Sequence, residues 1–162
     1  PEKEFNLVMA DIINKDPFAD AIFINQGERD GIQANDPVIT PEKVLVGRVE
    51  EVLPDFSRVT LVSDKKSSFD AQIEKQDGKI IKGAIRGSGN FELLFDLVPQ
   101  GEKLEKGDLI VTAAMGGKFP KGLLAGEITG VNPSDIRPFQ SAKAKTLFKL
   151  DDLTIVFIIT NN

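Results

Sequence analysis

The stretch Asp36–Val52 reads DPVITPEKVLVGRVEEV and indicates the fold class of this chain. Its first part, Val38–Thr40, is a β-branched run between two prolines, which limits it to a brief strand. Its second part, Val44–Val52, is a longer strand pattern that contains Gly47. A glycine inside a strand indicates a bulge or a tight bend, which small barrels need at their corners. The stretch therefore predicts two short strands of an all-β fold.

Similar strand patterns occupy most of the remaining chain and alternate with turn signals rich in Gly, Pro, Asn and Asp. No useful length of sequence carries the apolar periodicity of an amphipathic helix. Short strands separated by such turns are typical of small barrels or sandwiches. The further predicted strands are Ala21–Asn25, Arg58–Ser63, Phe69–Glu74, Lys79–Arg86, Phe91–Val98, Leu109–Ala113, Leu123–Val131, Ala142–Leu150 and Leu153–Thr160.

The chain also contains an internal repeat, which indicates two related β-units. The repeated segments keep their order, with one insertion at Gly116–Gly122. We therefore predict two small barrels in tandem, the first within residues 1–66 and the second within residues 67–162. The sequence leaves open whether the first barrel borrows strands from the C-terminal segment. The paired segments are Gln26–Glu28 with Gln100–Glu102, Asp36–Thr40 with Asp108–Thr112, and Leu45–Val52 with Leu124–Val131.

The composition excludes several classes of function. The net charge is −5 and the cations are scattered, so a nucleic-acid partner is not expected. The absence of Cys removes disulfides and thiolate sites, and the absence of His removes the side chain best suited to proton transfer near neutral pH. No apolar run reaches the roughly 18–20 residues that cross a bilayer. We predict neither a cofactor nor a metal site.

Hydrolase chemistry is the alternative that these counts leave open. A Ser–Lys dyad requires a buried, deprotonated lysine, and Ser67, Ser68 and Ser141 lie near Lys65, Lys66 and Lys143 in polar turns or at strand ends. A carboxylate pair would have to come from Glu50-Glu51, Glu102 with Glu105, or Asp151-Asp152. Neighbouring residues on a strand point to opposite faces, so the first pair would not converge. We interpret all of them as solvated surface residues.

Candidate protein-binding residues lie in three places. Leu153–Ile159 is almost continuously apolar and contains Ile155 and Phe157, which fits either an interface or a central strand. Phe119 and Pro120 sit in the insertion, where the ring either anchors a partner or packs under the loop. Phe139 raises the same question.

A set of short motifs runs through most of the chain. Each motif is weak alone, but the set runs in order from about Asp16 to Ile159. The motifs are Ile24-Asn25-Gln26-Gly27, Asp30-Gly31-Ile32, Pro37-Val38-Ile39-Thr40, Leu45-Val46-Gly47-Arg48-Val49, Ser57–Asp64 (SRVTLVSD), Gly107-Asp108, Val111-Thr112, Gly116–Leu123 (GGKFPKGL) and Gly126-Glu127-Ile128. In this order the motifs resemble the periplasmic region of the MreC family of rod shape-determining proteins. They place structural turns at Gly27, Gly31, Gly47, Gly107, Asp108, Gly116, Gly117, Gly122 and Gly126.

The resemblance implies two six-stranded antiparallel β-barrels and no catalysis. It implies a periplasmic scaffold of the cell-wall elongation machinery that maintains cell shape and is anchored to the cell membrane through a segment upstream of residue 1. Its implied partners are an elongation penicillin-binding protein, an MreD-type membrane protein and further copies of the same chain. A generic β-barrel adaptor unrelated to cell shape remains a second alternative beside the hydrolase.

Overall fold

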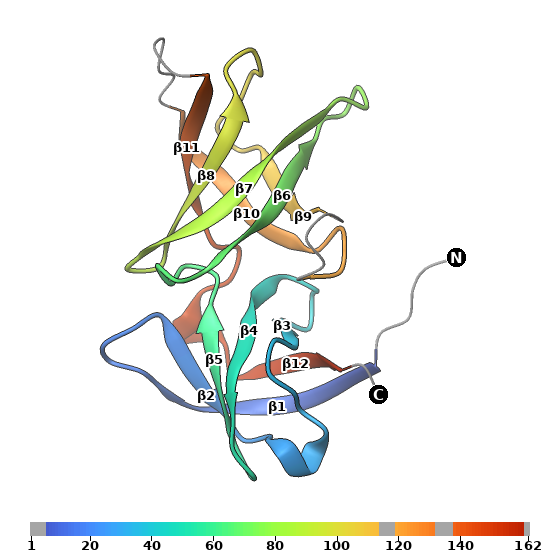
Figure 1. Ribbon diagram of the computed structural model, residues 1–162, viewed down its shortest axis with the longest axis vertical. Coiled ribbons are helices and arrows are strands. Elements are labelled where there is room, and N and C mark those ends of the chain that lie inside the picture. The colour runs from blue at the N-terminus through green and yellow to red at the C-terminus, as the bar shows by residue number, and fades with distance from the viewer. Residues whose placement is uncertain (1–5, 114–118, 132–137, 161–162) are drawn as a thin grey trace. The chain divides into compact units, whose positions relative to one another are not determined.

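The fold is all-β, as predicted. The computed structural model describes residues 6–113, 119–131 and 138–160, which form β-strands and two short 3₁₀ helices. No α-helix occurs in these ranges. All strand pairs are antiparallel and close into two barrels of six strands each (Figure 1). The fold class implied by the family resemblance is therefore confirmed.

Barrel 1 closes in the order β1-β12-β3-β4-β5-β2. Its interior is filled by aliphatic side chains that alternate with outward-facing residues, and Ile22, Ile24, Leu45 and Leu61 are fully buried. Its strands are β1 (Asn6–Lys15), β2 (Ala21–Ile24), β3 (Pro37–Ile39), β4 (Leu45–Val52), β5 (Ser57–Leu61) and β12 (Ile155–Thr160), with the 3₁₀ helices η1 (Glu28–Asp30) and η2 (Leu150–Asp152) in its loops.

Barrel 2 closes in the order β10-β11-β8-β7-β6-β9. Phe95, Ile85, Ile110 and Ile128 are fully buried in its core. Its strands are β6 (Ser68–Glu74), β7 (Ile80–Gly89), β8 (Glu92–Pro99), β9 (Leu109–Thr112), β10 (Leu124–Val131) and β11 (Phe139–Lys145).

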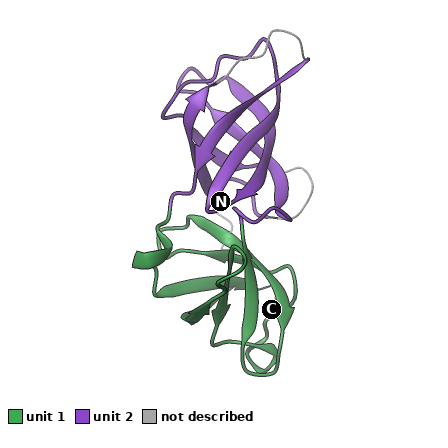
Figure 2. Ribbon diagram, turned by 90° about the vertical axis from the view of Figure 1, so that its left-hand side faces the viewer, with its two compact units in different colours: residues 1–61, 148–162 green, residues 62–147 purple. Residues whose placement is uncertain are grey.

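The division into units differs from the predicted ranges at the C-terminus. One compact unit contains residues 1–61 and 148–162, and the other contains residues 62–147 (Figure 2). The physical reason is the position of β12, whose two edges pair with β1 and β3. The last strand of the chain therefore belongs to barrel 1, although the sequence between β5 and β12 builds barrel 2.

The two barrels share one topology. The neighbours β3-β4-β5-β2-β1-β12 in barrel 1 correspond in order to β9-β10-β11-β8-β7-β6 in barrel 2. The strand that opens barrel 2, β6, therefore corresponds to the strand that closes barrel 1, β12. Barrel 1 is thus a circular permutation of barrel 2. Five strands follow the same chain order in both barrels, β1–β5 and β7–β11. The repeated sequence segments fall in β3, β4 and the loop after β2 in barrel 1, and in β9, β10 and the loop after β8 in barrel 2.

The repeated segments Asp36–Thr40 and Asp108–Thr112 make the same hydrogen bonds in the two barrels. Asp36 Oδ2 accepts the Gln33 N–H at 2.9 Å, and Asp108 Oδ2 accepts the Glu105 N–H at 2.9 Å. The carbonyl oxygen of each aspartate accepts from the second strand after it, through the N–H groups of Val49 in β4 and of Ile128 in β10, both at 2.9 Å. The repeat in sequence is therefore a repeat in structure.

The predicted turn residues lie at turns or at close contacts. Gly31, Gly107 and Gly122 have left-handed φ angles of 83°, 94° and 88°. At Gly47 the constraint is space, because an added Cβ would lie 2.0 Å from the Thr60 carbonyl oxygen. Gly126 would place a Cβ 3.1 Å from Leu93 Cδ1. Gly116 and Gly117 lie outside the described residues.

Removal of residues 148–162 should unfold barrel 1 and leave barrel 2 folded. Without β12, both β1 and β3 lose a partner and barrel 1 has two open edges, whereas every strand of barrel 2 is retained. In the truncated chain, hydrogen exchange measured for each backbone amide should be slow in residues 68–99 and fast in residues 21–61. Equal protection of both ranges in the truncated chain would contradict the assignment of β12.

Gly27→Ala and Gly101→Ala should differ, although both glycines lie in the repeated Gln-Gly-Glu. A Cβ at Gly27 would lie 2.2 Å from the Leu53 carbonyl oxygen, whereas a Cβ at Gly101 meets no atom within 4 Å. We expect Gly27→Ala to lower the free energy of unfolding by at least about 2 kcal/mol, and Gly101→Ala to change it by less than about 0.5 kcal/mol. Urea denaturation measures both, and similar losses would contradict the close contact.

Candidate interaction surfaces

Barrel 1 carries an apolar outer face over β1 and β12, which we call the β1–β12 face. Met9 is 56% exposed at its centre and lies opposite the half-buried Phe157. Leu7 and Ile13 extend the face along β1, and Ile155 extends it along β12.

One charged residue interrupts this face and is held by local hydrogen bonds. Asp11 lies opposite Ile155, and its carboxylate accepts from the Asn25 side-chain amide at 3.3 Å. The Asn25 Oδ1 atom in turn accepts the Asp11 N–H at 2.8 Å. The other side chains of the face are apolar, so a protein partner can cover them without breaking an ion pair. Such a lack of charged residues is typical of the core of a protein interface.

The structure locates the other predicted interaction residues. Ile155 is exposed, but β12 is paired on both edges and offers only its outer face, so strand addition has no edge there. Phe119 is buried and meets Phe69 edge-to-face, with ring centroids 5.0 Å apart. Pro120 is half-buried, and its carbonyl accepts from Thr112 Oγ1 at 2.5 Å. Phe119 thus packs as local core.

Phe139 is exposed at the start of β11 on barrel 2. The next residue, Gln140, is buried, and its Nε2 donates to the carbonyl oxygens of Glu102 at 2.6 Å and Pro99 at 3.1 Å. These bonds fix the loop beside Phe139 without covering the ring. Phe139 therefore remains a candidate contact residue, apart from the β1–β12 face.

Sequence reasoning missed β1, which supplies half of the β1–β12 face. Its sequence, NLVMADIINK, lacks alternation because apolar residues point both into the barrel and out of it. The signal that was available is the apolar run Leu7–Ala10. A short run of this kind does not by itself distinguish a strand from another segment.

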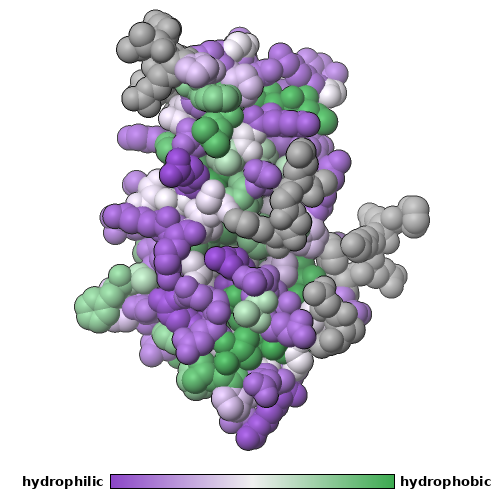
Figure 3. Space-filling model, in the orientation of Figure 1, coloured by the Kyte–Doolittle hydropathy of each residue, from purple (hydrophilic) through white to green (hydrophobic). Residues whose placement is uncertain are grey.

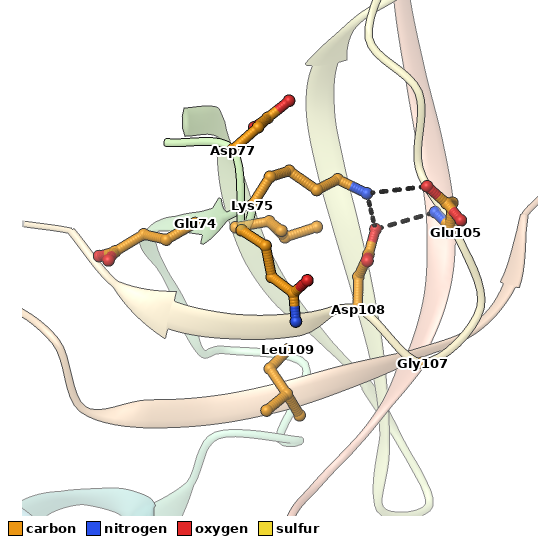
Figure 4. Close-up of a pocket in the computed structure, with 9 residues that line it drawn as sticks. Glu74, Lys75, Asp77, Glu105, Gly107, Asp108 and Leu109 are labelled. Carbon is orange, nitrogen blue, oxygen red and sulfur yellow. Dashed lines mark hydrogen bonds and ion pairs between the residues drawn. The ribbon is translucent and has the colours of Figure 1, made fainter. Parts of the chain in front are cut away.

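A pocket of about 540 Å³ opens on barrel 2 between the β6–β7 turn and the loop before β9. Lys75 crosses it and forms ion pairs with Asp108 at 2.7 Å and Glu105 at 3.4 Å (Figure 4). Asp108 raises the pKa of Lys75, chiefly through this hydrogen bond. The pocket is lined by Ile73, Glu74, Lys75, Gln76, Asp77, Glu105, Gly107, Asp108 and Leu109.

The residues considered for hydrolysis do not converge on a buried base. Lys65, Lys66 and Lys143 are exposed, so the desolvation that a lysine base requires is missing at all of them. Glu50 is bound by Arg58 and Thr60, whereas Glu51 is exposed. Asp151 and Asp152 are exposed in η2, and Glu102 and Glu105 pair with lysines.

Within the described residues, no group of three or more His, Cys, Asp or Glu side chains is placed to hold a metal ion. The same part of the chain contains no helix with the length and apolarity that a membrane span requires.

The closed barrels place this chain among the double-barrel β proteins. A family model described as rod shape-determining protein MreC, barrel core, matches residues 12–160. This match covers most of the chain, so the chain belongs to the MreC family.

Curated relatives carry the same family name. The cell shape-determining protein MreC of Haemophilus influenzae is 35% identical over 145 residues, which cover 89% of this chain and 40% of that protein. The Escherichia coli protein of that name is 28% identical over 145 residues, which cover 89% of this chain and 38% of that protein. The chain therefore spans about 40% of the length of these two relatives.

Solved structures show the same fold. A crystal structure of MreC from Pseudomonas aeruginosa superimposes with a TM-score of 0.86 at 28% identity, covering 95% of this chain and 99% of that chain. A complex between penicillin-binding protein PBP2 and MreC from Helicobacter pylori contains a chain that matches with a TM-score of 0.70 at 17% identity, covering 97% of this chain. At that identity the second match shows the fold alone.

Asp36→Asn and Asp108→Asn should have opposite effects on stability at pH 7, although the two aspartates occupy equivalent turns. Burial raises the pKa of Asp36, although the hydrogen bond from the Gln33 N–H acts in the opposite direction. The ionised carboxylate therefore destabilises the folded state relative to the neutral carboxyl. An amide oxygen still accepts the Gln33 N–H, and we expect a gain on the order of 1 kcal/mol. Asp108→Asn removes the ion pair with Lys75, and we expect a loss of about 1 kcal/mol.

The pH dependence of the Asp36→Asn effect on stability provides the control. A carboxyl whose pKa is raised by folding contributes stability below its unfolded value of 3.8, and that contribution is lost as the pH rises through the folded pKa. The advantage of Asp36→Asn should therefore disappear as the pH falls toward 4. Thermal unfolding between pH 4 and pH 8 measures it, and an advantage independent of pH would contradict the burial of a charge at Asp36.

Proposed function

We propose that this chain is a non-catalytic, extracytoplasmic scaffold of the cell-wall elongation machinery, which maintains cell shape by binding a peptidoglycan transpeptidase and by self-association. Membership of the MreC family supports the cell-shape role, because its curated relatives are named cell shape-determining proteins. The partner class is supported by the Helicobacter pylori complex of PBP2 with MreC. A non-catalytic role agrees with exposed lysines beside the candidate serines.

The observation that carries the self-association is the β1–β12 face. A closed barrel offers no free edge for strand pairing, so a second copy binds through a sheet face or a loop. The face is apolar, and its exposed residues Leu7 and Ile13 are each three positions from Ala10 in the sequence of β1. A two-fold axis near Ala10 would therefore set Leu7 of one copy against Ile13 of the other, as an isologous interface requires.

Family membership also supports the remaining parts of the proposal. These are an MreD-type membrane protein as a partner and attachment to the cell membrane through a segment outside the two barrels. The periplasmic setting is supported by a matching structure described as the major periplasmic domain of the cell shape-determining filament MreC, which has a TM-score of 0.81 at 18% identity.

Met9→Asp should weaken self-association without unfolding barrel 1, because the side chain is more than half exposed. Sedimentation velocity over a range of protein concentrations should show a dimer for the wild type and a monomer for Met9→Asp. Added salt should strengthen the wild-type dimer, since each copy carries a net charge of −5 and the contact is apolar. The control is Ile80→Asp, which places a charge at an exposed position on barrel 2.

Binding of the same organism's elongation transpeptidase, measured with the immobilised enzyme, tests the other half of the proposal. A chain that stays monomeric at millimolar concentration and does not bind the transpeptidase would overturn the proposed function. A dimer that Met9→Asp leaves intact would overturn only the role of the β1–β12 face.

A further inference from the structure

The β1–β2 loop of barrel 1, residues 16–20, presents a phenylalanine almost entirely to solvent. Phe18 is 95% exposed, the highest value among the exposed large apolar side chains of the described residues. In Figure 3 a hydrophobic group projects at the left-hand edge of the view, where Figure 1 has this loop. Other phenylalanines make ring contacts, such as Phe56 with Phe23 at a centroid distance of 6.4 Å. The Phe18 ring gains almost nothing from the fold of its own chain.

The backbone on both sides of Phe18 is held in place. The Phe18 N–H donates to Asp16 Oδ1 at 2.8 Å, which closes a turn around Pro17, whose ring fixes its own φ angle. The Asp16 N–H donates to the Ala21 carbonyl at 3.0 Å, and the Leu61 N–H donates to the Asp20 carbonyl at 2.9 Å. The loop is therefore bound to β2 and to the end of β5.

A shielded ion pair adds a third restraint. Arg58 Nη2 donates to Asp16 Oδ2 at 3.0 Å, and the side chains of Arg58 and Asp16 are only 17% and 20% exposed. Arg58 also pairs with Glu50, which accepts from Thr60 Oγ1 at 2.8 Å. The Phe18 N–H, and after it Arg58, lower the pKa of Asp16. The loop is thus tied to β4 and β5 through charged hydrogen bonds.

We propose that Phe18 is a pre-organised anchor that inserts into an apolar pocket of a different protein. Aromatic side chains dominate the binding energy of many interfaces, and a loop that is already ordered loses little entropy when it binds. The inference rests on the proposed function in one respect, because the transpeptidase is the first partner to test.

The charges around Phe18 and on the whole chain limit the kind of partner site that can accept the Phe18 ring. Of the two carboxylates in residues 16–20, Asp16 is paired with Arg58 and Asp20 is buried, so the ring of Phe18 stands in surroundings with little exposed charge and fits a pocket that is itself apolar. The pocket on barrel 2 is lined by four acidic residues and one lysine, so it is too polar to accept the Phe18 ring of a second copy. A membrane surface is disfavoured, because anionic lipids repel a chain of net charge −5 and one ring gives little insertion energy.

The test is the affinity of the chain for the same organism's elongation transpeptidase. Phe18→Ala should weaken binding by about 30-fold or more, and Phe18→Trp should stay within about 3-fold of the wild type. Phe91→Ala, at an exposed phenylalanine of the β7–β8 turn, is the matched control and should leave binding unchanged. Phe18→Ala should also leave thermal unfolding unchanged, which separates anchoring from folding. A wild-type affinity in Phe18→Ala would overturn the anchor and leave the proposed function standing.

A second readout decides the case in which the wild-type chain does not bind the transpeptidase. The full-length protein carrying benzoylphenylalanine at position 18 or at position 91 is irradiated in growing cells. An adduct at position 18 with another protein, identified by mass spectrometry and suppressed by excess wild-type chain but not by the Phe18→Ala chain, would support the anchor. Adducts formed only with a second copy, only with lipid, or no more often than at position 91 would overturn it.

Discussion

The antiparallel pairing of β12 with β1 and β3 is the constraint on which the rest of barrel 1 depends. A barrel has no edge only when its last strand is in place, and this one arrives after the chain has built all of barrel 2. Barrel 2 is made from one continuous segment. The two barrels therefore reach the same strand arrangement although their strands follow one another differently along the chain. The strands that close barrel 1 are farther apart in the sequence than those that close barrel 2, and contacts between distant segments form more slowly.

Duplication explains why the two barrels resemble each other in detail and also where they differ. The turn before β3 and the turn before β9 use an aspartate in the same way, but Lys75 neutralises only Asp108, and Asp36 is buried. The repeated glycines diverge similarly, since Gly27 lies against the Leu53 carbonyl and Gly101 faces open space. The aspartate pair keeps its local hydrogen bonds while its surroundings differ, and the glycine pair keeps its sequence while the space around it differs.

Closure also determines how such a protein binds others. With every strand paired on both sides, the barrels cannot accept an added strand, so binding falls to sheet faces and loops. The β1–β12 face offers apolar area with few charges, whereas the β1–β2 loop offers one ring on an ordered backbone. In the proposed function, the first surface serves self-association and the second serves contact with a pocket of another protein.

The sequence alone determined the all-β class, the repeat and most strands, because alternation, glycine turns and the Asp36–Thr40 and Asp108–Thr112 segments depend on local chemistry. From the apolar run of Leu153–Ile159 it predicted Ile155 and Phe157 as candidate contact residues. It missed β1, which is apolar on both faces, and it gave no reason to single out Phe18. Only the tertiary structure decided that β12 closes barrel 1, that Phe119 packs on Phe69, and that Phe18 is exposed. The physical reason is that pairing and exposure are set by contacts between segments far apart in the chain, which no local pattern records.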